Sequence, residues 1–137
     1  MARNDISNYC VEITDESTWN SVIEASDEKL VVIDCHQDWC GRCEAVMPTF
    51  QRLFLDYDGC ETRLLIANVA IDNFKSQIQS LIPTDAHIDV EKIGCLPLFL
   101  MIRFKSCVSC IQGVDTPGIT QQVAMNIPEY KSAEDEL

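Results

Sequence analysis

The chain has 137 residues, of which 47% are apolar, and a net charge of −12. This length and apolar content suit one folded domain and exclude disorder over most of the chain. The negative charge argues against binding to nucleic acid or to an acidic membrane surface, because both repel an anionic protein.

The first half of the chain is predicted to contain two helices and two buried strands. Residues 17–25 place apolar side chains at helical spacing, and Thr14 or Asp15 could cap this helix. Residues 29–34 contain a continuous apolar run, which is typical of a strand buried on both faces. Helical periodicity then starts at Arg42, and Pro48 predicts a kink in this helix, which ends at 58–59. Residues 62–71 are predicted to form a second buried strand.

The second half is predicted to contain a helix, a β-hairpin and a last helix. Residues 73–82 have the spacing of an amphipathic helix. Residues 98–104 and 108–112 indicate two strands of a hairpin, with the turn near Ser106 and Cys107. Pro117 suits the first turn of a final helix that ends at Asn126.

This order of elements predicts an α/β fold with a central mixed β-sheet and helices on both faces. We expect a single domain over residues 1–127. An exposed acidic tail is expected over residues 128–137.

Eight cysteines raise the question of a disulfide scaffold. The polar N-terminal residues 1–5 predict no signal peptide, and no apolar run is long enough to span a bilayer. The last four residues, 134–137, look like an ER-retention tetrapeptide, which would require a route into the ER that we do not see. We therefore expect a cytoplasmic protein with mostly reduced thiols.

The segment Trp39-Cys40-Gly41-Arg42-Cys43 follows a buried strand and precedes a helix. Two cysteines separated by two residues at a helix start form a dithiol that can close into a disulfide. The helix N-terminus stabilises the thiolate of the first cysteine, and that thiolate can attack another disulfide. The motif therefore predicts a disulfide-exchange site.

The chain resembles the thioredoxin family over roughly residues 7–126. Five features occupy positions where the thioredoxin family has a signature residue. They are Trp39 with the dithiol that follows it, Asp34, Pro48, the pair Leu96-Pro97, and Gly113. The resemblance implies a thioredoxin fold and thiol–disulfide oxidoreductase activity.

The resemblance also implies a role for each of these positions. Cys40 would be the attacking thiol and Cys43 the buried resolving thiol. Asp34 would be a buried carboxylate that exchanges a proton with Cys43, and burial would raise its pKa toward neutrality. Pro97 would be a cis proline that presents the backbone of Leu96 to an extended substrate.

The expected partner-contacting residues surround the dithiol. They are Trp39, Gly41, Arg42, Cys95, Leu96 and Pro97. The redox-active disulfide Cys40–Cys43 would serve in place of any cofactor, and we expect no metal site.

A narrower resemblance is to the thioredoxin-like light chains of ciliary outer-arm dynein. It rests on short stretches of similar sequence at residues 32–40, 97–100 and 111–113. It implies a place in the ciliary axoneme and a dynein heavy chain or another axonemal protein as partner.

The chain departs from ordinary thioredoxins at several positions. Arg42 replaces a proline and should favour the Cys40 thiolate, whereas Glu44 replaces a lysine and opposes this effect. Asn68 replaces the family's lysine partner of the buried aspartate. The segment between Asp72 and Pro97 is about ten residues longer than in the family, judged from the resemblance, and is either a partner-binding insertion or a neutral surface loop.

Cys107 and Cys110 form a second CxxC. On a strand, residues three apart have Cα atoms roughly 10 Å apart, too far for a disulfide unless a turn bends the chain. We expect ordinary hairpin cysteines, and zinc binding with His36 or His87 has no supporting ligand spacing.

Three functions fit the sequence. The first is an outer-arm dynein light chain that keeps a redox-active dithiol and binds a heavy chain. The second is a free cytosolic thioredoxin that acts as a general disulfide reductase, with thioredoxin reductase as partner. The third is a structural adaptor without redox turnover.

Overall fold

The computed structural model describes residues 10–37, 46–92 and 97–129. Within them five strands form one mixed sheet in the order β1-β3-β2-β4-β5. Both β1 and β2 run parallel to β3, whereas β4 is antiparallel to β2 and to β5. The strands are β1 (Cys10–Ile13), β2 (Leu30–His36), β3 (Leu64–Ala70), β4 (Leu98–Arg103) and β5 (Ser106–Gln112).

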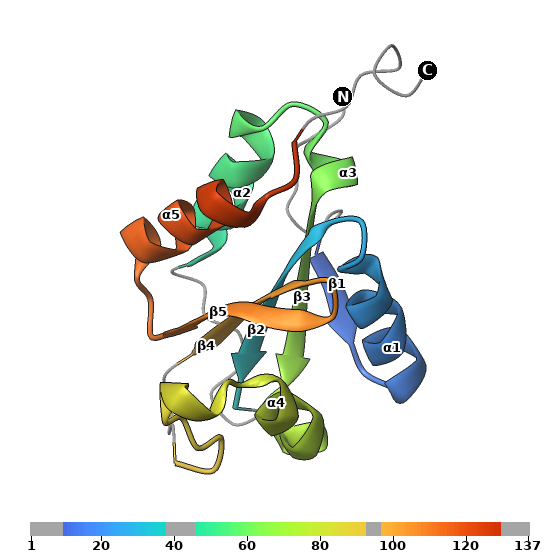
Figure 1. The fold of residues 1–137 in the computed structure, drawn as a ribbon, viewed down its shortest axis with the longest axis vertical. Coiled ribbons are helices and arrows are strands. Elements are labelled where there is room, and N and C mark those ends of the chain that lie inside the picture. Colours follow the sequence, from blue (N-terminus) through green and yellow to red (C-terminus); the bar gives the residue numbers. More distant parts are fainter. Residues whose placement is uncertain (1–9, 38–45, 93–96, 130–137) are drawn as a thin grey trace.

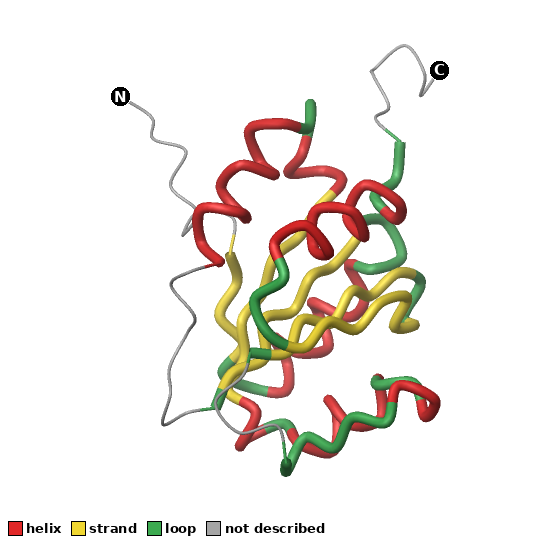
Figure 2. Tube along the Cα trace, turned by 90° about the vertical axis from the view of Figure 1, so that its left-hand side faces the viewer, coloured by secondary structure: helices red, strands yellow, loops and turns green. Residues whose placement is uncertain are grey.

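Helices cover both faces of this sheet, as predicted (Figures 1 and 2). On one face lie α1 and α4, and on the other lie α2 and α5. The helices are α1 (Glu16–Ala25), α2 (Met47–Asp56), α3 (Cys60–Arg63), α4 (Lys75–Leu81) and α5 (Thr116–Asn126), with short 3₁₀ turns at η3 (Ile71–Asn73) and η4 (Thr84–Ala86).

Alternating side chains of the buried strands divide the core into two layers. Along β2, Val31 and Ile33 pack into the layer under α1 and α4. Leu30 and Val32 pack into the layer under α2 and α5. In this second layer the rings of Phe50 and Phe99 meet edge to face, 6.0 Å apart. Because strand residues alternate between faces, Asp34 belongs to the α2 face.

Several predicted boundaries need correction. The strand β1 was not predicted at all, and β3 starts at Leu64 rather than Thr62 because residues 60–63 form the short helix α3. The hairpin turn lies at Phe104 and Lys105, two residues before the predicted place, with both backbones in the left-handed region. Two consecutive positive φ angles give the turn the twist that a two-residue hairpin requires.

The described part of helix α2 begins at Met47, so Pro48 lies in its first turn. There the missing N–H of proline removes no intrahelical hydrogen bond. The predicted kink would involve the residues before Val46, which lie outside the described residues.

The longer segment after β3 is tied to the rest of the molecule. Trp19 of α1 stacks on Phe74 with ring centroids 5.4 Å apart. The Gln79 side chain donates to the Ile88 carbonyl at 2.9 Å and accepts from the Val90 N–H at 3.0 Å. Ile78, Ile82 and Val90 join the core under α1 and α4. These contacts give the segment an ordered surface.

Of the two predicted caps of the first helix, Thr14 and Asp15, the structure shows Asp15, and this cap makes the stability of the helix depend on pH. Its carboxylate accepts the Thr18 N–H at 2.7 Å, and this hydrogen bond lowers the pKa of Asp15 from its ordinary value of 3.8. A lowered folded-state pKa stabilises the protein above pH 3.8, and this contribution is lost as the pH falls through the folded value.

We therefore expect wild-type protein to lose more thermal stability on acidification than an Asp15→Asn variant, whose neutral amide still caps the helix. Melting temperatures measured from neutral pH down to about pH 3 test this, since that range spans the carboxylate titration. Parallel curves for the two proteins would contradict it.

Candidate functional site

The buried carboxylate predicted from the sequence is confirmed as a buried residue of the central strand. Asp34 lies on β2 and is 1% exposed. Its neighbours across the sheet are Asn68 on β3 and Phe99 on β4. Asp34 is therefore surrounded by strands on both sides, near the end of β2 from which residues 38–45 continue.

A row of polar residues runs from Asp34 to the edge of the sheet. Asn68 is paired with Asp34 on one side and with Glu12 of β1 on the other. Asn68 is buried, whereas Glu12 is exposed. The Asn68 amide donates to the Cys10 sulfur at 3.3 Å. This row joins the buried carboxylate to the β1 edge of the sheet.

A pocket of about 210 Å³ opens at the solvent end of this row. Glu12, Asn68 and His36 line it together with Ile13, Thr14, Ala70 and Asn73. The pocket gives water access to the Asn68 side chain from the β1 edge. The sequence did not indicate it, because β1 was not predicted and the register of β1 on β3 cannot be read from the local pattern.

Pro97 is buried at the start of β4. Its carbonyl accepts the Gly113 N–H at 2.7 Å, which ties the beginning of β4 to the end of β5. Gly113 has φ +86°, a conformation that favours glycine. Gly113 thereby closes the β4–β5 ladder at this end and fixes the position of Pro97.

The dithiol itself lies outside the described residues. The same holds for Trp39, Gly41, Arg42, Cys95 and Leu96, and therefore for the predicted cis bond between Leu96 and Pro97. The strand before the dithiol segment, β2, is nevertheless paired with β4, the strand that follows Pro97. Cys35 near the end of β2 pairs with Leu98 at the start of β4. The chain therefore leaves β2 toward the dithiol and enters β4 through Pro97 at the same end of the sheet.

Four of the described cysteines have the character of inert thiols. Burial raises the pKa of Cys60 to about 11 and that of Cys110 to about 12. Burial also raises the pKa of Cys107, and it raises that of Cys35 well above its ordinary range. These four thiols are protonated at neutral pH, and a protonated thiol is a poor nucleophile. Cys35 is therefore a core residue and Cys60 an inert thiol.

We expect iodoacetamide at neutral pH to label Cys40 much faster than Cys35, Cys60, Cys107 or Cys110. Peptide mass spectrometry over a time course measures each rate. The same labelling in guanidinium is the control, because unfolding removes the burial that keeps these thiols protonated. Equal rates for Cys110 and Cys40 in the folded protein would contradict this assignment.

The described residues hold no group of three or more metal-ligating side chains placed to bind an ion. No helix among them is long and apolar enough to cross a membrane.

Comparison with known proteins identifies the family. The sequence profile of the family described as thioredoxin matches residues 10–121. The chain belongs to the thioredoxin family. This assignment agrees with the sheet order, the buried Asp34 and the position of Pro97.

Two relatives of this thioredoxin-family chain are flagellar proteins of Chlamydomonas reinhardtii. The 16 kDa light chain of outer-arm dynein is 32% identical over 106 residues, which cover 77% of this chain and 62% of the relative. The 14 kDa light chain of the same arm is 28% identical over 116 residues, which cover 84% of this chain and 79% of the relative. The chain therefore matches less than two thirds of the first relative.

The fold is also that of solved thioredoxins. A crystal structure of a thioredoxin from Nicotiana alata has a TM-score of 0.62 at 16% identity, covering 88% of this chain and 94% of that one. The predicted α/β thioredoxin fold is confirmed.

Proposed function

We propose that this chain is a thioredoxin-like light-chain subunit of an axonemal outer-arm dynein, with a redox-active dithiol at Cys40 and Cys43. The observation that carries the proposal is its similarity to two outer-arm dynein light chains of Chlamydomonas reinhardtii, at 32% and 28% identity. In this proposal the chain works in the cilium, bound to a dynein heavy chain or to another axonemal protein.

The proposed reaction is disulfide exchange with a protein substrate. The Cys40 thiolate attacks one sulfur of a target disulfide, forming a mixed disulfide and releasing the other target sulfur, which takes up a proton. Cys43 then loses its proton and attacks the Cys40 sulfur. The target leaves as a dithiol, reduced by two electrons, and the chain holds a Cys40–Cys43 disulfide. A second dithiol, such as that of thioredoxin reductase, must reduce this disulfide before another cycle.

Asp34 is the proposed proton acceptor for Cys43. It lies on the α2 face of the sheet, at the end of β2 that leads into the dithiol. Burial disfavours the charged form of a carboxyl group, which makes it able to exchange protons closer to neutral pH than a surface carboxylate. The pocket lined by Glu12, His36 and Asn68 supports this role, since it brings solvent to the neighbour of Asp34.

The segment from Ile71 to Lys92 supports a role in holding a partner. It lies at the end of the sheet where β2 and β3 finish and where β4 begins (Figure 1). Its packing on Trp19 and its Gln79 hydrogen bonds give it a fixed shape. A partner could therefore contact this segment and the dithiol together.

Fractionation of cilia tests the proposed location. We expect the protein to sediment with demembranated axonemes and to be released by high salt together with dynein heavy chain. An axoneme preparation that lacks outer arms is the control and should lack the protein. A purely soluble pool in the cell would overturn the proposal.

A general protein disulfide reductase is the second candidate. The retained pair Cys40 and Cys43, with Asp34 and Pro97, favours it, because the thioredoxin resemblance gives these residues the roles of a disulfide reductase. It predicts rapid reduction of insulin with thioredoxin reductase and no association with axonemes.

A further inference from the structure

His36 lies on the same face of the sheet as Asp34. The two residues are two positions apart on β2, and alternate residues of a strand point to the same side. Their Cα atoms are about 6.6 Å apart, since a strand rises about 3.3 Å per residue. Asp34 is buried and His36 is half-buried. A charge on the imidazole is therefore close to the carboxylate and only partly surrounded by bulk water.

The pocket at the β1 edge gives both residues a common solvent space. It measures about 210 Å³ and is lined by His36, by Glu12 and by Asn68, which is the β3 neighbour of Asp34. The β3 neighbour of His36 is Ala70, which also lines the pocket. A methyl group at this position leaves room beside the imidazole. The pocket can hold several water molecules, each of which takes roughly 30 Å³ in the liquid.

The charged groups described around His36 are all acidic. Glu12 on β1 is exposed and lines the same pocket, and Asp34 lies on the same face of β2. On η3, Asp72 is exposed beside a residue that lines the pocket. Asp38, two residues beyond His36, lies outside the described residues. An imidazolium at position 36 is therefore surrounded by negative charge.

No other base lines this pocket among the described residues. The carboxamides and the hydroxyl that complete the lining do not titrate. Cys10 on β1 is a further titratable group of this face, and its sulfur accepts the Asn68 amide N–H at 3.3 Å. On the other side of β2, β4 begins with the apolar Leu98. His36 is thus the one described side chain placed to bring a positive charge beside Asp34.

The two side chains are close enough to change each other's protonation. Opposite charges favour each other's ionised forms, so an imidazolium stabilises the Asp34 carboxylate and the carboxylate stabilises the imidazolium. At about 7 Å, with an effective dielectric between those of protein and water, this coupling amounts to about one pH unit. Such a coupling acts in the physiological range, because histidine gains its charge there.

We propose that His36 is a positioning residue that acts through Asp34: its imidazolium holds Asp34 as a carboxylate, ready to take the proton of Cys43 at mildly acidic pH. In that step the Cys43 thiol gives its proton to the Asp34 carboxylate, leaving a thiolate and a carboxylic acid, and His36 keeps its own proton. This role in exchange rests on the proposed redox function, whereas the coupling between the two side chains does not.

The sign of the pH effect follows from the two titrations. Below its own midpoint His36 is charged and lowers the pH at which Asp34 takes up a proton. Above that midpoint the imidazole is neutral, and Asp34 is ionised without its help. His36 therefore extends disulfide exchange on the acid side of the pH range.

Proton NMR of the histidines tests the coupling in the reduced chain, which contains two of them. Asp34→Asn should lower the titration midpoint of His36 by about one pH unit, because the neutral amide no longer stabilises the imidazolium. His87, an exposed residue after η4, is the internal control and should titrate as in wild type. An unchanged His36 midpoint would overturn the proposal.

The reverse change tests the same coupling, since a coupling free energy is reciprocal. His36→Gln should raise the midpoint of the Asp34 carboxyl, followed by carbon-13 NMR, by a similar amount. Glu12→Gln is the matched control, because the charge of the exposed Glu12 is screened by solvent. It should shift His36 less than Asp34→Asn does. A larger shift with Glu12→Gln would assign the pairing to Glu12 and contradict the role of His36.

The pH profile of insulin reduction by the reduced protein tests the effect on exchange. His36→Gln should move the acid limb of the rate profile up by about one pH unit, so its loss of rate is greatest at acid pH. His87→Gln is the control and should keep the wild-type profile. An equal loss at every pH, or identical profiles, would overturn the role of His36.

The two kinds of measurement separate this inference from the proposed function. Coupled midpoints in a chain that reduces no disulfide at any pH would refute the redox function and leave the pairing of His36 with Asp34 standing. Rapid reduction of insulin by a chain whose midpoints are not coupled would refute the pairing and leave the redox function standing.

Discussion

Replacing Cys40 with serine is expected to reduce insulin-disulfide turnover to the uncatalysed rate. A serine hydroxyl does not ionise near neutral pH and cannot form the mixed disulfide, so the first step of the exchange is lost. Turnover is measured by insulin turbidity with dithiothreitol as reductant, which makes the assay independent of any reductase.

The control for this change is Cys60→Ala. Cys60 is buried on α3, burial raises its pKa to about 11, and its thiol donates to the Leu53 carbonyl at 3.8 Å. This variant should reduce insulin at the wild-type rate. If wild-type protein itself shows no turnover, the adaptor function without redox chemistry would replace the one proposed.

Phe50→Ala is expected to lower the free energy of unfolding by about 3–5 kcal/mol, the usual cost of truncating a buried phenylalanine. Phe50 is 1% exposed and meets the ring of Phe99 edge to face. Phe99 is in turn the β4 neighbour of Asp34. The substitution therefore opens a cavity between α2 and the strand that supports the proposed proton acceptor.

Leu55→Ala on the same helix is the matched control, since Leu55 is 59% exposed. Its effect should stay within about 0.5 kcal/mol. Urea unfolding followed by far-ultraviolet circular dichroism gives both values. A loss below about 1 kcal/mol for Phe50→Ala would show that the α2 layer is not packed as described.

The fold could be predicted largely from the sequence because its central strands are strongly apolar. The runs that form β2 and β4 are buried on both faces, and such runs are recognisable without knowledge of their neighbours. The four residues of β1 are too few to show a pattern, and one of them is Glu12. This strand exists because it pairs with β3, which is a tertiary effect.

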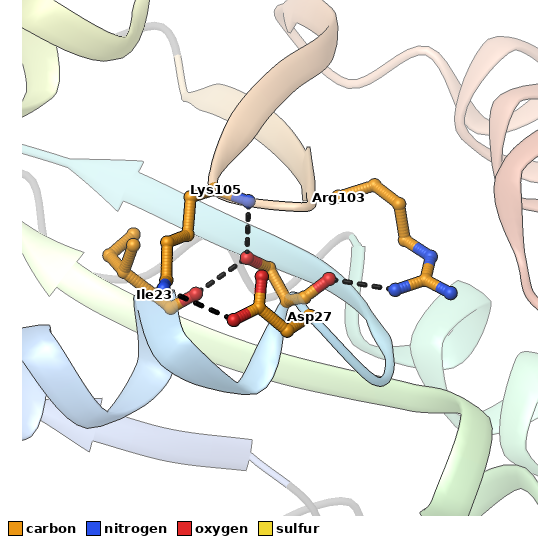
Figure 3. Close-up of polar contacts among 5 residues, drawn as sticks. Ile23, Asp27, Arg103 and Lys105 are labelled. Carbon is orange, nitrogen blue, oxygen red and sulfur yellow. Dashed lines mark hydrogen bonds and ion pairs between the residues drawn. The ribbon is translucent and has the colours of Figure 1, made fainter.

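The hairpin turn was misplaced for a similar reason. Phe104 and Lys105 are not residues that favour positive φ, so no glycine or asparagine marks the turn. Contacts with Ser26, the residue that follows α1, fix the hairpin in this position (Figure 3). Those contacts join residues almost 80 positions apart and leave no local signal in the sequence.

The candidate site, too, could be predicted from the sequence only in part. Asp34 could be predicted because it stands six residues before Cys40 in a recognisable motif. The row from Asp34 through Asn68 to Glu12 could not, since it arises from the register of three strands. The shared face of Cys107 and Cys110 likewise depends on a bulge, which sequence periodicity alone does not reveal.

The most direct test of the central claim is to trap the partner of Cys40 in a ciliary extract. A Cys43→Ser variant should accumulate a mixed disulfide, because the resolving thiol is absent. The account predicts a reductant-sensitive adduct with an outer-arm dynein protein, missing when Cys40 is also replaced. No adduct, or adducts only with unrelated cytosolic proteins, would contradict it.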